Sequence, residues 1–353
     1  MMIKMRLYKI LKAALLSCGM LCMVSGNAAA SGSVEIPFTA IDGVQVGNAQ
    51  SDAGKTGVTV LLFKDSAKTG VHISGGGPAS RETPVLDPTK EDLGIHAVVL
   101  GGGSAYGLAA ADGVMKCLEE HSIGFDTGFA LIPLVVQSDI FDLSYGSAKI
   151  RPDSKMGYKA CLDALNGNHP ISGSVGAGTG ATVGKICGMA QSMKAGIGYH
   201  AVQVGDLKLG AVVVVNALGD IYSPKDGKKI AGLLNKERTA FLDSVSELYT
   251  LSTPQDLYSR TNTTIGAIVT NGKFDKAQLT RIAAQATNAY ARCINPVGTL
   301  ADGDTIYASS CGEQVAADVN MVGTLAAEVM AKAIENAVVS SKMSDDEYLK
   351  YCL

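Results

Sequence analysis

A polar cluster stands directly before an apolar segment near the end of the chain. Residues 260–264 read Arg-Thr-Asn-Thr-Thr, and residues 265–269 read Ile-Gly-Ala-Ile-Val. Strands are usually bounded by Gly, Pro, Asn, Asp or Ser, whereas here paired threonines follow an asparagine. A threonine hydroxyl needs a base to act as a nucleophile. A threonine at the start of a chain carries one, its α-amine, with a pKa of roughly 7.7–8.0.

Such an N-terminus can arise by self-cleavage. The Thr263 hydroxyl would attack the carbonyl of Asn262 and form an ester, and water would then release Thr263 as a new N-terminus. Asn-Thr pairs are common, so the dipeptide alone equally describes a polar strand start. Thr264 is the alternative nucleophile. Successive side chains of a strand point to opposite faces, so Thr264 should face away from Thr263 and ranks below it.

Motifs for other chemistries do not occur in the sequence. It contains no GxSxG elbow, no HExxH and no CxxC, and the five histidines lack metal-ligand spacing. The glycine run 176–181 does not follow a clear strand, as a dinucleotide fingerprint requires. Gly184-Lys185 is followed by Ile186, where a P-loop needs Ser or Thr. The sequence therefore predicts neither a metal nor an organic cofactor.

Composition narrows the class of protein. The chain has 353 residues, 47% hydrophobic and 18% charged, which is typical of globular domains. The net charge is −3, and acidic and basic residues are interspersed. Because no basic stripe is present, we expect no nucleic-acid partner.

The first thirty residues have the pattern of a signal peptide. Residues 4–12 carry lysine and arginine, residues 13–24 are apolar, and alanines at 28–30 suit cleavage after Ala30. The alternative is an uncleaved anchor, but the apolar run is shorter than the ~20 residues that a membrane span needs. We expect a periplasmic or secreted mature chain that is not attached to the membrane.

Six cysteines remain in the mature chain once Cys18 and Cys22 leave with the leader: Cys117, Cys161, Cys187, Cys293, Cys311 and Cys352. An oxidising compartment permits disulfides. Several of the six stand in apolar, periodic contexts that are typical of small core residues, so their pairing stays open.

Strands and helices alternate along the chain. Hydrophobic runs predict strands at 59–63, 96–100, 211–215, 264–270 and 305–308. Helical periodicity predicts helices at 105–120, 276–291 and 316–338, and residues 220–259 read as a polar, linker-rich excursion. This alternation predicts an α/β or layered α+β architecture.

Several motifs agree in order and spacing with one known family. They are GGGPASRET (75–83), IHAVVLGGGSAYGLAAADGVM (95–115), Phe141-Asp142, Arg151-Pro152-Asp153, GSVGAGTGATVGK (173–185), VVVVNALGD (212–220), NTTIGAIVTN (262–271) and DGDTIYA (302–308). On these motifs the chain resembles the L-aminopeptidase/D-esterase family, which also contains β-peptidyl aminopeptidases and nylon-oligomer endo-hydrolases.

The resemblance implies a four-layer αββα sandwich made as one precursor. Such a precursor cuts itself into an α chain and a β chain that stay together. Thr263 matches the family's nucleophile, so the implied cleavage lies between Asn262 and Thr263. The α chain would span residues 31–262 and the β chain residues 263–353. The resemblance and the apolar C-terminal helix also suggest a homo-oligomer of αβ units.

Four further site residues are implied by the same resemblance. Asn216 matches an asparagine that stabilises the oxyanion, a role that its amide NH₂ suits. Lys185 matches a lysine near the nucleophile, where a cation can lower the pKa of the amine or assist proton transfer. Asp302 and Asp304 match an acidic pair that would hold the α-ammonium and the threonine hydroxyl. The alternatives are a turn-capping asparagine, a surface lysine and solvated carboxylates.

One position departs from the family pattern. Some relatives carry a tyrosine near Phe141 whose hydroxyl contributes to the oxyanion site, and phenylalanine has no such donor. Either Tyr145 substitutes for it, or a backbone N–H supplies the second donor.

We therefore expect an N-terminal-threonine amidohydrolase that acts as an aminopeptidase on small peptides, amides or esters. An endo-amidase on ω-amino-acid oligomers is the alternative within the family. A non-catalytic binding protein, never processed, is the alternative from another class, and an acetyltransferase of related fold is a further alternative.

Overall fold

A computed structural model describes two stretches of the chain, residues 32–250 and 262–353. The fold below is that of residues 35–353, which separate from residues 1–34 as a unit. The predicted leader, residues 1–30, and its cleavage after Ala30 lie outside the described residues. Residues 251–259 of the predicted polar excursion also lie outside them.

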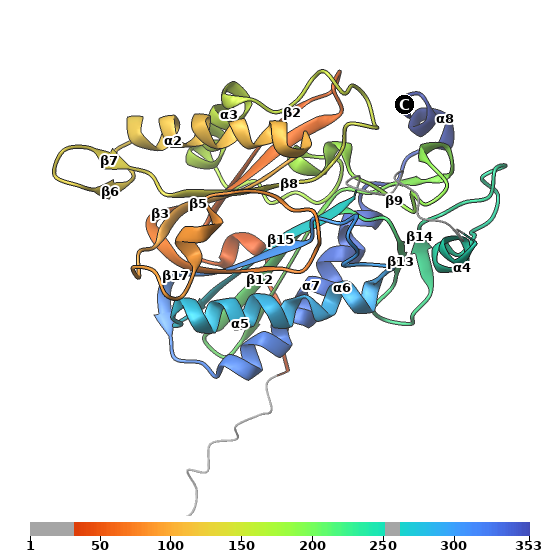
Figure 1. The fold of residues 1–353 in the computed structure, drawn as a ribbon. Helices are drawn as coiled ribbons and strands as arrows, with labels where there is room; N and C mark the ends of the chain where they lie inside the picture. Colours follow the sequence, from red (N-terminus) through yellow and green to blue (C-terminus); the bar gives the residue numbers. More distant parts are fainter. Residues whose placement is uncertain (1–31, 251–261) are drawn as a thin grey trace, which may run out of the picture. The chain divides into compact units, whose positions relative to one another are not determined.

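A large mixed sheet forms the centre of this unit (Figure 1). Its strands run in the order β11 (Ile197–Val204), β12 (Leu207–Asn216), β15 (Thr263–Gly272), β17 (Thr305–Val315), β3 (Thr56–Ile73), β5 (Ile95–Gly101), β8 (Val135–Asp139) and β4 (Ala79–Arg81), and β2 (Gln45–Ser51) pairs with β3. The short strands are β1 (Val34–Glu35), β6 (Phe125–Asp126), β7 (Leu131–Ile132), β9 (Thr182–Val183), β10 (Met193–Lys194), β13 (Asp220–Tyr222), β14 (Lys229–Ala231) and β16 (Ile294–Asn295).

The strand β3 belongs to two parts of the sheet. Its first half pairs with β2 and β5, and its second half pairs with β17. A register shift between Leu62 and Ala67 separates the halves. Buried side chains from both parts, such as Leu61 from β3, Val212 from β12 and Ile265 from β15, meet in one core cluster. Both parts of the sheet therefore contribute side chains to this core.

Helices cover the sheet on two sides (Figure 1). The covering helices are α2 (Ala110–Glu120) and α3 (Ser154–Asn166) on one side, and α5 (Lys276–Ala286), α6 (Asn288–Cys293) and α7 (Val319–Val339) on the other. The short helices α4 (Ser244–Tyr249) and α8 (Asp345–Leu349) do not cover the sheet. On one side, Val114 of α2 shares a buried cluster with Val99 of β5. On the other, Ile334 of α7 and Leu279 of α5 share a cluster with Ile268 of β15.

The predicted strands and helices are present, with shifted bounds. The predicted strands lie inside β3, β5, β12, β15 and β17. The helix predicted from residue 316 begins at Val319, because the Asp318 carboxylate accepts hydrogen bonds from the N–H groups of Asn320 and Met321. The helix predicted over 105–120 begins as the 3₁₀ turn η3 (Ser104–Ala109) and continues as α2. The helix predicted over 276–291 is split into α5 and α6.

The glycine run that only partly matched a nucleotide motif serves packing instead. Residues Gly176–Gly180 form the 3₁₀ turn η4. A Cβ at Gly176 would stand 2.3 Å from Thr59 Oγ1, and one at Gly178 would stand 2.3 Å from the Ile197 nitrogen. These glycines let the turn lie directly against β3 and β11. The remaining 3₁₀ turns are η1 (Phe38–Ala40), η2 (Thr83–Leu86) and η5 (Met189–Gln191).

The six cysteines of the predicted mature chain are free thiols in this structure. Cys117, Cys161, Cys293 and Cys311 are buried, in line with the core positions that their sequence context indicates. Within residues 32–250 and 262–353, no helix combines the length and the apolar character needed to cross a bilayer.

The contact between α2 and α3 yields a stability prediction. A Cβ at Gly157 of α3 would stand 1.9 Å from the Ala110 oxygen of α2. Because backbone cannot retreat as a side chain can, Gly157→Ala should force the helices apart and lower the free energy of unfolding by about 1–3 kcal/mol. Urea unfolding monitored by circular dichroism measures this change.

The matched control is Lys159→Ala on the exposed face of the same helix. Its effect should stay within about 0.5 kcal/mol. Equal stabilities for the two variants would contradict the packing assigned to Gly157.

Candidate active site

The pairing of β12 with β15 brings two predicted site residues together. The strands are antiparallel, and Asn216, the last residue of β12, lies opposite Thr263, the first residue of β15. Thr263 is 4% exposed and Asn216 is fully buried. The Thr263 hydroxyl donates a hydrogen bond to the carbonyl oxygen of Asn262. It therefore lies beside the carbonyl that it was predicted to attack.

The side chain of Asn216 is held from both ends. Its Oδ1 accepts from the Thr182 N–H at 3.1 Å and from Lys185 Nζ at 3.0 Å. Its Nδ2 donates to the carbonyl oxygen of Phe141 at 2.8 Å. An amide nitrogen has two N–H donors, and these contacts fix the direction of both. The side chain of Asn216 is thus held in place at the end of β12 opposite Thr263.

Lys185 is buried rather than on the surface. Its Nζ donates to the Asn216 main-chain oxygen at 3.0 Å as well as to the side chain. Burial disfavours the ammonium and lowers the pKa of Lys185 to about 7, although attraction to Asp302 and Asp142 opposes this shift. The side chain can therefore gain or lose a proton near neutral pH.

The predicted acidic pair lies at the same place but holds other groups in the uncut chain. Asp304 Oδ1 accepts from the N–H of Thr264 at 2.6 Å, and its Oδ2 accepts from Gly298 at 3.0 Å. Asp302 Oδ2 accepts from the N–H and hydroxyl of Thr299. Burial, reinforced by repulsion from Asp302, raises the pKa of Asp304 to about 7. Contacts of the pair with a freed α-ammonium stay a prediction for the cleaved chain.

The question about Phe141 has a structural answer. Its backbone carbonyl orients Asn216, so the identity of the side chain does not affect this contact. The ring of Tyr145 stacks on Tyr348 of α8 with centroids 5.2 Å apart, and its hydroxyl lies 3.5 Å from Met343 Sδ. Tyr145 therefore packs against the C-terminal segment and is not placed to replace the missing hydroxyl.

Two neighbours of the site were missed in the sequence. Thr182 binds Asn216 through its backbone N–H. Asp142 accepts from Thr56 Oγ1 at 2.6 Å and from the Gly103 N–H at 2.7 Å, and burial raises its pKa to about 6. Both stand inside motifs quoted for the resemblance, but neither residue type nor spacing marked them individually.

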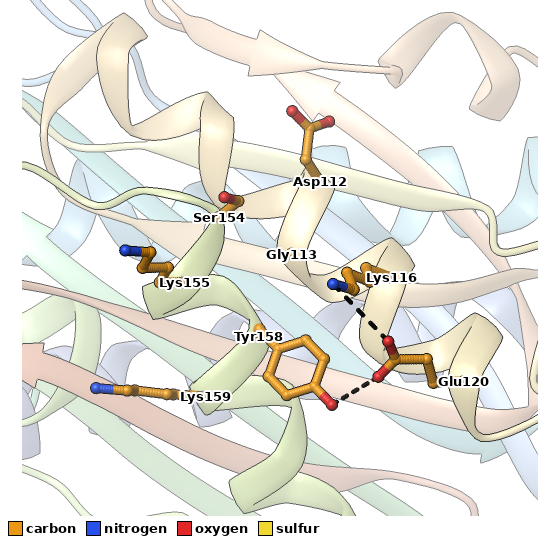
Figure 2. Close-up of a pocket in the computed structure, with 8 residues that line it drawn as sticks. All are labelled: Asp112, Gly113, Lys116, Glu120, Ser154, Lys155, Tyr158 and Lys159. Carbon is orange, nitrogen blue, oxygen red and sulfur yellow. Dashed lines mark hydrogen bonds and ion pairs between the residues drawn. The ribbon is translucent and has the colours of Figure 1, made fainter.

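Other features of the described residues do not suggest a second chemistry. No cluster of three or more His, Cys, Asp and Glu side chains suited to a metal occurs within them. A groove of about 520 Å³ lies between α2 and α3 (Figure 2), lined by Asp112, Gly113, Lys116, Glu120, Ser154, Lys155, Tyr158 and Lys159. None of the predicted site residues lines this groove.

Comparison with solved structures shows which fold this chain shares. A β-aminopeptidase of Burkholderia sp. superposes with a TM-score of 0.62 at 18% identity, covering 91% of this chain and 95% of that one. An L-aminopeptidase D-Ala-esterase/amidase of Ochrobactrum anthropi also gives 0.62 at 18% identity, covering 88% and 89%. The latter structure was described as a new variant of the Ntn hydrolase fold. The fold of this chain is similar to this Ntn hydrolase fold.

Sequence comparison then gives the family. The profile of Peptidase family S58 matches residues 37–347. An uncharacterized aminopeptidase of Mycobacterium leprae is 36% identical over 334 residues, 86% of this chain and 90% of the relative. A 6-aminohexanoate-oligomer endohydrolase of Kocuria sp. is 31% identical over 310 residues, 84% of each chain. The chain belongs to peptidase family S58 and is a hydrolase of amide bonds, which confirms the predicted resemblance.

The lowered pKa of the buried Lys185 side chain allows a prediction of how the free energy of unfolding depends on pH. The pKa of Lys185 falls from 10.5 to about 7 on folding, so between these pH values the unfolded chain binds the extra proton. Stability contributed by this group therefore rises with pH in that window. Relative to Lys185→Met, the lysine chain should gain at most about 1.4 kcal/mol per pH unit between pH 7 and 9.

Urea unfolding at several pH values measures this gain, in a Thr263→Ala background to keep both chains uncut. Lys159→Met, at an exposed position on α3, is the control and should show no such trend. If the stability difference between the chain that retains Lys185 and the Lys185→Met chain is constant with pH, the assignment is contradicted.

Proposed function

We propose that this chain is a self-processing N-terminal-threonine amidohydrolase that cleaves itself between Asn262 and Thr263. The observation that carries the proposal is the position of the Thr263 hydroxyl, which donates to the Asn262 carbonyl oxygen while Asn216 lies opposite Thr263. Thr264 is the weaker candidate, because its buried Oγ1 makes no hydrogen bond within the described residues and its N–H is held by Asp304.

Self-cleavage proceeds through an ester. The Thr263 Oγ forms a bond with the carbonyl carbon of Asn262, the bond from that carbon to the Thr263 nitrogen breaks, and the hydroxyl proton ends on the freed amine. Water then hydrolyses the ester and restores the hydroxyl. The products are an α chain that ends at Asn262 and a β chain that begins at Thr263.

Turnover of a substrate repeats the same chemistry on another carbonyl. The α-amine of Thr263 takes the hydroxyl proton as Oγ attacks the substrate carbonyl carbon, and it passes this proton to the amine or alcohol that leaves. The Asn216 amide, oriented by Phe141, Thr182 and Lys185, donates to the oxyanion. The resulting acyl-enzyme is hydrolysed by water. Lys185, whose pKa is near 7, is suited to tune the charge beside the amine.

We favour peptides with a free N-terminus as substrates. Two buried carboxylates, Asp302 and Asp304, stand beside the nucleophile and can bind a substrate ammonium. The aminopeptidase names of the M. leprae relative and the Burkholderia structure agree with this choice. The 6-aminohexanoate-oligomer endohydrolase relative, together with the Asn-Thr-Thr start, supports endo-cleavage of ω-amino-acid oligomers as the second candidate.

Four further features belong to the proposal. Three core clusters, one under α2 and α3, one between the parts of the sheet and one under α5 and α7, support a four-layer αββα sandwich. Residues 31–262 and 263–353 are the proposed α and β chains. The leader, residues 1–30, directs the protein to the periplasm or out of the cell. We also propose a homo-oligomer of αβ units.

Replacement of the nucleophile tests the mechanism. The wild-type protein should yield two chains, the smaller one starting Thr-Thr-Ile-Gly-Ala. Thr263→Ala should remain one chain and lose peptide hydrolysis by at least about 10³-fold, because the attacking oxygen is gone. Intact mass and N-terminal sequencing measure the first result, and initial rates on aminoacyl amides measure the second.

Thr264→Val is the matched control, since it removes a hydroxyl that makes no hydrogen bond within the described residues, and it should still cleave. A wild-type chain that stays uncut after long incubation near neutral pH would remove the mechanism and favour the binding-protein alternative. In the same sample, N-terminal sequencing of the larger chain tests the proposed leader, since removal of residues 1–30 gives a chain that starts at Ser31. Light scattering of the native protein measures the mass of the assembly and so tests the proposed homo-oligomer.

Blocking the substrate distinguishes the two substrate classes. If a carboxylate binds the substrate ammonium, acetylation of a peptide's N-terminus should lower kcat/KM by about 10²-fold or more, because the charge-assisted bond is lost. Mass spectrometry of the products from free and acetylated 6-aminohexanoate and α-peptide oligomers measures this. Equal rates on blocked and free oligomers, with internal fragments as products, would establish the endo-amidase instead.

A further inference from the structure

The backbone of Gly303 lies against the bond proposed for self-cleavage. Its N–H donates to the carbonyl oxygen of Asn262 with an N···O distance of 3.2 Å. The same oxygen accepts from the Thr263 hydroxyl, and Asn262 forms a parallel β-bridge with Asp302. The oxygen that becomes negative when Thr263 attacks therefore already faces a backbone donor.

A second segment holds this donor in place. The Gly77 N–H donates to the main-chain carbonyl oxygen of Asp302 at 2.8 Å. The Ser74 N–H donates to the main-chain carbonyl oxygen of Asp304 at 3.0 Å. A Cβ at Gly75 would stand 2.3 Å from the Asp304 nitrogen, so only glycine permits this approach. The glycine run 75–77 thereby clamps both residues that flank Gly303. A donor fixed before the reaction costs no reorganisation during it.

Gly303 itself also has no room for a side chain. A Cβ there would stand 2.9 Å from Thr263 Oγ1 and 2.9 Å from the Gly77 oxygen. The residue between the two aspartates must therefore be small for the hydroxyl of Thr263 to keep its place beside Asn262.

We infer that the N–H of Gly303 is the oxyanion donor of self-cleavage. This inference rests on the proposed cleavage at Asn262–Thr263. As the bond from Thr263 Oγ to the Asn262 carbon forms, the carbonyl electron pair moves onto the Asn262 oxygen, and the Gly303 N–H donates a hydrogen bond to this oxyanion. The pair returns as the bond to the Thr263 nitrogen breaks, and the hydroxyl proton leaves with that nitrogen. Asn216, whose Nδ2 donates to Phe141, serves the later hydrolysis of substrate.

Replacing one backbone N–H by oxygen tests the inference. The full chain is translated in vitro with codon 303 decoded as glycolic acid, which keeps the shape of glycine but turns the N–H into an ester oxygen. Intact mass over time gives the rate of cleavage at Asn262–Thr263, and any break at the new ester has a different mass. The rate should fall about 10²–10³-fold relative to the chain with glycine at 303.

Glycolic acid at position 227 is the matched control. The Gly227 N–H donates to the Ser223 oxygen at 3.0 Å in the turn between β13 and β14, so the control also loses one backbone hydrogen bond. It should cleave at the normal rate. Resistance to trypsin checks that both ester chains fold.

The possible outcomes separate this inference from the proposed function. If the wild-type chain and the chain with glycolic acid at position 303 cleave at Asn262–Thr263 equally fast, the role of Gly303 is overturned and the Thr263 mechanism stays intact. If the wild-type chain never cleaves, both the role of Gly303 and the Thr263 mechanism are overturned.

A second pair of variants covers an ester chain that does not fold. Gly303→Ala should slow self-cleavage at least about tenfold by displacing Thr263 Oγ1, a loss of about 1.4 kcal/mol or more at the transition state. Gly32→Ala should not, because a Cβ at this position would meet no atom within 4 Å. Equal rates for these two variants would overturn the inference.

Discussion

The antiparallel pairing of β12 with β15 is the constraint on which the site depends. Its register sets Asn216 opposite Thr263 at the point where one strand ends and the other begins. A shift of one residue would turn every side chain of β15 to the other face of the sheet. Because β15 is buried along its whole length, such a shift would also break the packing of two core clusters. The hydrophobic core thus enforces the alignment of the polar end.

Burial is the second determinant of the chemistry. Lys185 and Asp304 are both removed from water, and each pKa moves to about 7 from opposite directions. Burial disfavours the charged form of either group, so the ammonium loses its proton more easily and the carboxylate gains one more easily. Perturbed groups of this kind gather at functional sites. Their hydrogen bonds to Asn216 and to Thr264 keep the cost of this burial tolerable.

The site is assembled by backbone as much as by side chains. The Phe141 carbonyl and the Thr182 N–H orient Asn216, and the Gly303 N–H reaches the Asn262 carbonyl. These groups come from segments far apart in the chain. Glycine runs make the approach possible, since the 75–77 segment lies directly against residues 302–304. This explains why glycine-rich motifs surround a site that binds no nucleotide phosphate in the proposed mechanism.

The sequence by itself determined the mixed α/β class, the strand and helix centres, the family and the residues that gather around Thr263. Hydrophobic periodicity and motif order carry that information, because burial and family motifs both leave side-chain patterns. Tertiary structure alone decided the length of β3, the role of the Phe141 carbonyl, the packing of Tyr145 on α8 and the contact of Gly303 with Asn262. The physical reason is that every residue but proline carries the same N–H and C=O. Only the folded chain determines which of them meet.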